Sequence, residues 1–201
     1  MSIVKLSNNG VKNATAFGSI TGLGNLIFIS RSTASSSASV NITSGLTSTY
    51  KEYIFIFNNI HPATDGAKFQ FNLSVDSGSN YNVTKTTSFF HSFHTEDDSS
   101  TVLAYRGAAD LAQSTSDQVL FWEVDNDADS GASGYLHLFD PSSTTFVKQF
   151  IAQTSGVGNS ATAGNQYVGG YGNTTSAVDA IQFKMSSGNI DSGTIDMYGV
   201  S

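Results

Sequence analysis

The sequence predicts an all-β protein, an antiparallel β-sandwich of two sheets with jelly-roll order, and three observations support this fold class. Short apolar, β-branched or aromatic runs recur about every 12 to 20 residues, and Gly, Asn, Asp and Ser bound them. Several runs alternate apolar and polar residues, which is typical of antiparallel strands covered on one side. Helical periodicity is nearly absent, and only residues 108–113 suggest a turn or two of helix. A chain of strands without helices buries its apolar faces by packing one layer of strands against another, as in a sandwich.

Eleven segments carry the strand signal. In chain order they are Asn25–Arg31, Ser35–Ile42, Glu52–Asn59, Lys68–Val75, Thr84–His94, Gln118–Val124, Gly134–Phe139, Phe146–Gln153, Gln166–Tyr171, Ala180–Ser186 and Gly193–Val200. The clearest alternation places four apolar side chains on one face of their strand: Phe69, Phe71, Leu73 and Val75. We expect Phe69, Phe71 and Leu73 to be buried, together with Ile54 and Ile56 of the preceding strand.

The chain divides into a single β-sandwich domain, residues 25–201, and an irregular N-terminal arm, residues 1–24. The arm is rich in Gly and Asn turns, and its apolar side chains follow no regular period. A segment of this kind does not bury its apolar groups as a strand or helix of its own. We therefore expect it to contact a partner chain, a sister subunit or a neighbouring protein, through Val4, Leu6, Val11 and Phe17.

Uncharged polar residues dominate the polar part of the composition. The 201 residues include 31 serines, 20 threonines and 15 asparagines, whereas only 12% of the residues are charged. The hydrophobic fraction of 39%, rich in Phe, is sufficient for a packed core, so the chain is expected to fold. The net charge of −7 and the nine scattered basic residues argue against contact with nucleic acid or with an anionic membrane.

The absence of cysteine rules out disulfides, thiolate metal sites and a cysteine nucleophile. The N-terminus, Met1–Lys5, lacks the apolar region of a signal peptide. The longest apolar stretch, Tyr53–Phe57, is too short to span a bilayer. We expect a soluble protein that is not exported by a standard signal.

Two clusters raise the question of a metal site. His91 and His94 precede three acidic residues, but residues three apart in a strand face opposite sides, so the two rings are not expected to share an ion. The run Asp125–Gly131 resembles the start of an EF-hand loop, yet positions six and twelve are Ser130 and Leu136, where Gly and a carboxylate are required. We expect a plain turn and no metal, with a looser calcium site as the open alternative.

No catalytic motif is recognisable. The chain has no nucleophile elbow, phosphate-binding loop or zinc-binding helix motif. Its three glutamates, Glu52, Glu96 and Glu123, stand in no context that suggests a catalytic carboxylate pair. Serine is so abundant that its presence gives no support to a Ser/His/Asp triad. We expect a protein that is not an enzyme, with no catalytic residues and no cofactor.

Three parts of the chain carry a family resemblance. They are the opening Val4–Val11, the pair Tyr53–Phe55 and Ile60–Asp65, and the stretch Leu136–Thr145 with the ending Ile181–Val200. Together they resemble virion structural proteins of marine tailed phages, including phages of cyanobacteria, over essentially the whole chain. The ending, Ser-Gly-x-Ile-x-x-Gly-Thr-Ile-x-x-Tyr-Gly, is the most specific part and is similar to the final strands of many phage β-sandwich modules. The resemblance implies a place in the particle and no catalytic residue.

The expected function is protein–protein contact on the virion surface, after assembly in the host cytoplasm. The first hypothesis is a capsid decoration or cement subunit, a homo-oligomer and specifically a homotrimer, that bridges major capsid proteins. The alternative is a tail fibre or receptor-binding subunit, in contact with other tail proteins. Such a subunit would bind host glycans through exposed aromatics such as Trp122, Tyr167 and Tyr171. Small polar strand faces of Ser, Thr and Asn suit subunit contacts in either case.

Overall fold

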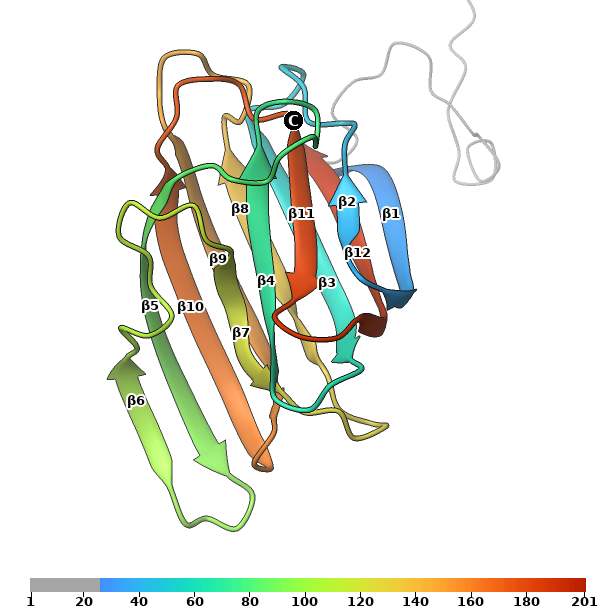
Figure 1. Cartoon of the computed structure of the whole chain (residues 1–201), viewed down its shortest axis with the longest axis vertical. Helices are drawn as coiled ribbons and strands as arrows, with labels where there is room; N and C mark the ends of the chain where they lie inside the picture. Colours follow the sequence, from blue (N-terminus) through green and yellow to red (C-terminus); the bar gives the residue numbers. More distant parts are fainter. Residues whose placement is uncertain (1–25) are drawn as a thin grey trace, which may run out of the picture.

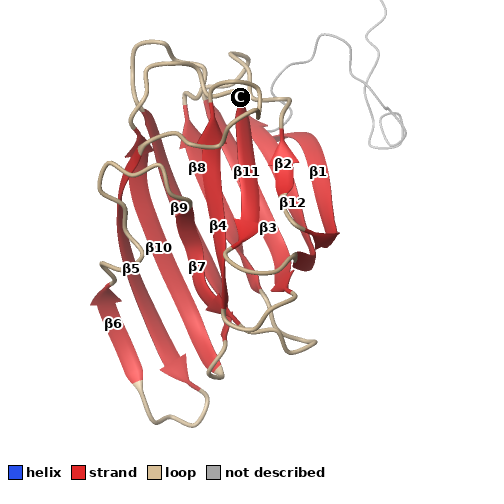
Figure 2. Ribbon diagram, in the orientation of Figure 1, coloured by secondary structure: helices blue, strands red, loops and turns tan. Residues whose placement is uncertain are grey.

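The computed structural model describes residues 26–201, and every regular element in this range is a β-strand (Figure 1 and Figure 2). The twelve strands are Leu26–Ser37 (β1), Val40–Ile42 (β2), Glu52–Pro62 (β3), Ala67–Ser74 (β4), Lys85–Thr95 (β5), Thr101–Tyr105 (β6), Gln118–Val124 (β7), Ala132–Phe139 (β8), Lys148–Gly158 (β9), Thr162–Gly172 (β10), Ala180–Met185 (β11) and Ile190–Val200 (β12). Every pairing between them is antiparallel. The prediction of an all-β antiparallel protein is confirmed. The predicted arm, residues 1–24, lies outside the described residues.

The strands form two sides that face each other. Eight strands make the large side, in the order β1-β12-β3-β8-β9-β10-β5-β6, and four make the small side, in the order β2-β11-β4-β7. The two sides meet where Val124 of β7 pairs with Gly158 of β9, and Asn159 N donates to Glu123 O at 3.0 Å beside this pair. The result is one continuous sheet that nearly closes like a barrel. The expected two separate sheets are not observed, because alternation predicts which faces are covered but not where the layers join.

Residues 108–113 contain no helix, in contrast to the prediction. The backbone N–H of Thr87 donates to Leu111 O at 2.9 Å, and that of Lys85 donates to Ser114 O at 2.8 Å, so the segment lies along β5. Contacts to a strand thus replace the internal hydrogen bonds of a helical turn. The prediction also omits β6, an edge strand with no buried residue, since no covered face imposes a pattern on it.

Phenylalanines from both sides fill the core. The ring of Phe183 on β11 lies 5.2 Å from Phe57 and 5.6 Å from Phe55 of β3, measured between centroids. These contacts join the small side to the large side. The three side chains of β4 that were predicted to be buried have no exposed area: Phe69, Phe71 and Leu73.

Ile54 and Ile56 face the other way from the prediction, although Ile54 is buried as predicted, with 9% of its surface exposed, while Ile56 is half-buried. The inner face of β3 carries Tyr53, Phe55 and Phe57, which are at most 1% exposed, so the two isoleucines lie on the outer face of the large side. Both faces of β3 are apolar, and alternation therefore does not distinguish them. The aromatic residues take the core because they bury more apolar area.

Two buried lysines close one end of the core. Lys85 and Lys148 have no exposed area and flank Gly172, one on each neighbouring strand. The Lys85 ammonium donates to Asn72 Oδ1 at 2.5 Å and to Val83 O at 2.7 Å. Burial lowers the pKa of Lys85 to about 8, because the charged form loses its hydration. The pKa of Lys148 is lowered for the same reason.

Candidate functional site

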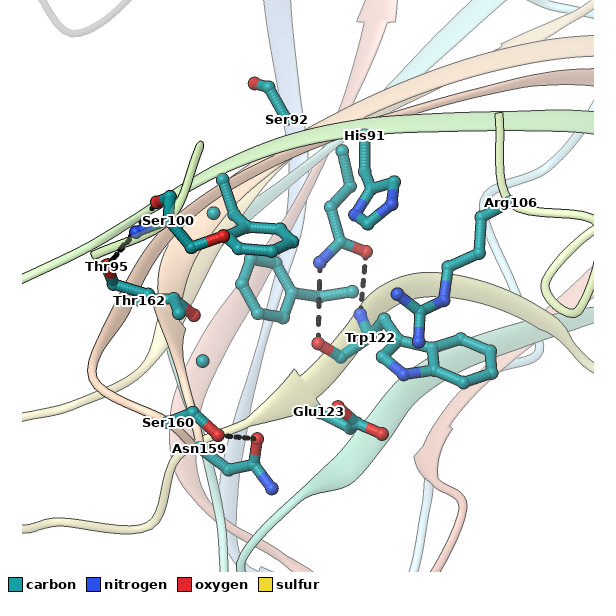
Figure 3. Close-up of a pocket in the computed structure, with 15 residues that line it drawn as sticks. His91, Ser92, Thr95, Ser100, Arg106, Trp122, Glu123, Asn159, Ser160 and Thr162 are labelled. Carbon is teal, nitrogen blue, oxygen red and sulfur yellow. Dashed lines mark hydrogen bonds between the residues drawn. The ribbon is translucent and has the colours of Figure 1, made fainter. Parts of the chain in front are cut away.

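A hollow of about 340 Å³ opens at one edge of the protein, where the large side is wider than the small side. Strands β10, β5 and β6 extend beyond β7, so part of their inner face has no strand over it (Figure 1). We call this space the edge hollow. Figure 3 shows the aromatic, charged, amide and hydroxyl side chains around it, among them His91, Arg106, Trp122, Glu123, Asn159, Ser160 and Thr162. Gln166 lines it as well.

Side chains of the large side hold the free edge of β7. Gln166, buried on β10, accepts from Trp122 N at 2.7 Å and donates through Nε2 to Trp122 O at 3.4 Å (Figure 3). The hydroxyl of Thr154 donates to Leu120 O at 2.6 Å. These side chains bond the backbone groups that a neighbouring strand would otherwise bond. Trp122 is therefore held firmly in the wall of the edge hollow.

A β-bulge directs Trp122 and Glu123 to the edge hollow. Between the pairs Phe69–Phe121 and Ala67–Val124, β7 has one residue more than β4. Glu123 adopts a φ of +61°, a left-handed conformation that costs about 1–3 kcal/mol in a residue with a side chain. Bulges and strained residues of this kind concentrate at functional sites, which makes this end of β7 a candidate.

Two cations lie against the Trp122 indole. Lys68 Nζ is 3.6 Å and Arg106 Cζ is 4.0 Å from the ring centroid, within the range of cation–π attraction. Among the described residues, Arg106 has no carboxylate partner, whereas both nitrogens of the Arg31 fork bind Asp196 at 2.6 Å. A positive group without a counter-ion therefore lines the edge hollow, in a protein whose net charge is −7.

Two buried N–H donors of the edge hollow have no acceptor. Arg106 Nε and Trp122 Nε1 are two of the three buried side-chain atoms in residues 26–201 that lack a hydrogen-bond partner. A buried donor left unpaired costs about 1–3 kcal/mol. Folded proteins keep few of them, and each calls for an explanation. Both donors belong to side chains that line the edge hollow.

The two histidines of β5 face opposite sides, as the alternation predicts. His91 is 7% exposed and lines the edge hollow, whereas His94 is exposed and its Nε2 lies 2.8 Å from Asp98 Oδ1. Burial, and then the nearby Arg106 charge, lower the pKa of His91, so its ring is neutral near pH 7. No group of three potential metal ligands occurs within residues 26–201.

A second surface is the outer face of the large side. One residue from each of its eight strands stands in register in a single line, which we call the outer row: Arg31, Asp196, Ile56, Tyr135, Gln153, Tyr167, Phe90 and Tyr105. Gln153 accepts from Tyr135 Oη and donates to Tyr167 Oη, both at 3.1 Å. The rings of Phe90 and Tyr167 stack at 4.8 Å. The outer row is thus a line of side chains whose polar groups largely bond one another.

Exposed apolar side chains extend this face beyond the outer row. Ile151 is 48% exposed on β9, and Leu103 is 79% exposed on β6. Two shallow grooves, of about 290 and 370 Å³, cross the face and share Tyr135 as a wall. Ile54 and Ile56 line the second groove. Contiguous apolar side chains of this kind on a surface mark contact sites for other molecules.

The other residues singled out in the sequence lie elsewhere. Asp125–Gly131 forms the loop between β7 and β8, where Ser130 Oγ donates to Asp125 Oδ2 at 2.7 Å. Glu52 lies 2.7 Å from His137 at the end of the paired strands β3 and β8. Glu96 follows β5 in the turn to β6. The three glutamates therefore form no cluster.

The aromatics proposed for glycan contact are not on one surface. Trp122 lines the edge hollow, while Tyr167 belongs to the outer row on the opposite face of β10. The sequence drew attention to Trp122 and Glu123 but not to Arg106 or Gln166, which complete the edge hollow. The sequence did offer one signal for Arg106, which is one of only two arginines in the chain.

Comparison with known proteins gives no relative. No protein-family model matches the chain, and no curated protein and no solved structure matches it either. Within the described range, the chain has no helix with the length and apolar character needed to cross a membrane.

Proposed function

We propose that this chain is a structural subunit of a phage virion, a capsid decoration or cement subunit on the particle surface that acts by protein–protein contact. Its partners in this proposal are the major capsid protein and further copies of the chain, with a homotrimer as the assembly and the N-terminal arm as an added contact. The observation that carries the proposal is the outer row with the exposed apolar side chains beside it. The sequence resemblance to phage virion proteins supports the same role.

The strand order also supports this proposal. Without β5, β6, β9 and β10, the large side has the order β1-β12-β3-β8 and the small side the order β2-β11-β4-β7. Successive strands of this set alternate between the two sides except for β4 and β7, which are neighbours on the small side, as in the double Greek key of a jelly roll. We infer that the domain is a jelly roll in which the four added strands widen the large side. Jelly rolls recur in viral capsid proteins.

The outer row fits a second copy of the chain. Two copies that each carry a charge of −7 repel one another, so a stable contact has to use surface of low charge. From Ile56 to Tyr105 the outer row contains no charged residue. Its Tyr135, Gln153 and Tyr167 groups are already hydrogen-bonded, so their burial leaves few polar groups unpaired. Aromatic residues of this type are enriched in the cores of protein interfaces.

The double substitution F90E/I151E is expected to convert the oligomer to a monomer. Phe90 is 44% and Ile151 48% exposed, so a carboxylate at either position reaches solvent in the monomer, but two carboxylates on this face oppose its burial. Sedimentation velocity should show a trimer for the unmodified chain and a monomer for the variant, with unchanged circular dichroism. Phe146→Glu is the matched control: its ring is 65% exposed in the loop between β8 and β9, and the variant should stay trimeric. An unmodified chain that is monomeric at high micromolar concentration would contradict the proposal.

The second candidate is a tail fibre or receptor-binding subunit that binds host glycans, and the edge hollow is the observation that favours it. The number of copies per particle distinguishes a capsid protein from a tail protein, because a capsid shell repeats its surface sites many more times than a tail does. Quantitative mass spectrometry of purified particles is expected to give hundreds of copies per particle. A few tens of copies or fewer would place the protein in the tail.

A further inference from the structure

We propose that the edge hollow binds a saccharide that carries a carboxylate, such as a hexuronic acid, with the carboxylate at the guanidinium group of Arg106. This site is separate from the proposed assembly surface, because the edge hollow lies on the inner face of β5 and β10 and the outer row on their outer face. A volume of about 340 Å³ is at the lower end of the range of about 300–1,000 Å³ for ligand sites.

The carboxylate is assigned from Arg106. Arg106 Nε and Trp122 Nε1 are buried without an acceptor, and Arg106 has no counter-ion among the described residues. The guanidinium fork matches the two oxygens of a carboxylate, and hydrogen bonds between charged partners are the strong ones. His91, the other basic side chain in the wall, is neutral near pH 7, so Arg106 carries the positive charge of the edge hollow.

The saccharide is assigned from the rest of the wall. Asn159, Ser160 and Thr162, at the turn from β9 to β10, bring an amide and two hydroxyls to the edge hollow. The carboxylate of Glu123 lines it as well, and forms no ion pair with a described residue. Groups of these types donate to and accept from the hydroxyls of a sugar. A simple anion would contact Arg106 and make no use of these groups, and a neutral sugar would leave Arg106 without a counter-ion.

The geometry also excludes stacking of the sugar on the Trp122 ring. Lys68 and Arg106 both lie within 4.0 Å of the Trp122 ring centroid and occupy positions that a stacked sugar ring would need. Trp122 therefore forms part of the wall and offers no free ring face to the sugar. This differs from the common arrangement in which a sugar stacks on an exposed aromatic ring.

Trp122 is the only tryptophan of the chain, so its fluorescence reports directly on the edge hollow. We expect D-glucuronate, titrated into the full chain at constant ionic strength, to change this fluorescence to saturation. D-glucose, which lacks the carboxylate, and acetate, which lacks the hydroxyls, should each bind at least about tenfold more weakly. Acetate or inorganic phosphate that binds as tightly as glucuronate would overturn the saccharide assignment. No saturable response to glucuronate would overturn the site.

Variants test the role of Arg106. Arg106→Gln is expected to weaken glucuronate binding at least about tenfold, and Arg106→Lys, which keeps the charge and loses the fork, should also bind more weakly. Lys51→Gln is the control, since it removes the same charge from an exposed ion pair with Asp140 outside the edge hollow, and its affinity should not change. Thermal unfolding shows that each variant is folded. Unchanged affinity in both folded Arg106 variants would overturn the proposal. Sedimentation of the same samples tests assembly separately.

Discussion

Replacement of Phe183 by alanine is expected to lower the free energy of unfolding by about 3–5 kcal/mol, because its ring has no exposed area. The ring lies 5.2 to 6.4 Å from the rings of Phe55 and Phe57 on β3 and of Phe69 and Phe71 on β4. The substitution therefore leaves a cavity between the small and large sides and removes aromatic pairs that add to the burial energy. Urea denaturation followed by circular dichroism measures the loss.

Phe146→Ala is the matched control for this experiment. Its ring is 65% exposed, so the same chemical change should alter the free energy of unfolding by no more than about 0.5 kcal/mol. Phe71→Ala should cost about as much as Phe183→Ala, since that ring is equally buried and lies 5.0 Å from Phe150. Phe183→Leu should cost less than the alanine variant, because it refills part of the cavity. A loss below about 1 kcal/mol for Phe183→Ala would show that the two sides do not pack around this ring.

The free energy of unfolding is expected to rise between pH 8 and pH 10.5, relative to a Lys85→Met variant. The folded protein releases the Lys85 proton near pH 8, whereas the unfolded chain keeps it until about pH 10.5. The unfolded state binds more protons in this window, so stability increases with pH there. A pKa lowered from 10.5 to about 8, at about 1.36 kcal/mol per unit, gives a gain of about 3 kcal/mol. Below pH 8 Lys85 is protonated in both the folded and the unfolded state. The difference in free energy of unfolding between the unmodified chain and Lys85→Met should therefore be constant there.

Denaturation of both proteins at several pH values measures this gain, and the comparison between them removes the contribution of the tyrosines. Met preserves the length of the buried side chain, although Asn72 Oδ1 and Val83 O lose the ammonium as a donor. Lys51→Met is the control: its ammonium is exposed beside Asp140, so the pH dependence should match that of the unmodified chain. A difference between the unmodified chain and Lys85→Met that stays flat up to pH 10.5 would show that Lys85 is hydrated in the folded protein.

Strand positions could be predicted where one face alone is apolar. The alternation of Phe69, Phe71 and Leu73 with polar residues gave both the strand and its buried face. On β3 the strand was predicted but the face was not, because Ile54 and Ile56 alternate with equally apolar neighbours. The pattern in a sequence indicates that a strand has an apolar face. Where both faces are apolar, it does not indicate which of them packs into the core.

The edge hollow required the tertiary structure. Trp122 and Gln166 are 44 residues apart in the chain, and the hydrogen bonds that join them follow from the way β7 lies over β10. Arg106 is the residue that follows β6, a strand that the sequence pattern did not predict, and its guanidinium lies against the same indole. Neither Arg106 nor Gln166 belongs to a motif with fixed spacing, so no local pattern could predict that they contact Trp122.

The sequence by itself determined that this protein is all-β, that its strands are antiparallel, that β4 buries its phenylalanines and that His91 and His94 face opposite sides. Each of these follows from the period of two that a strand imposes on neighbouring side chains. Only the tertiary structure decided that the two sides join at Val124 and Gly158, and that eight side chains line up as the outer row. Strand order and register depend on contacts between distant segments, and these are set by packing of the whole core rather than by any single stretch of residues.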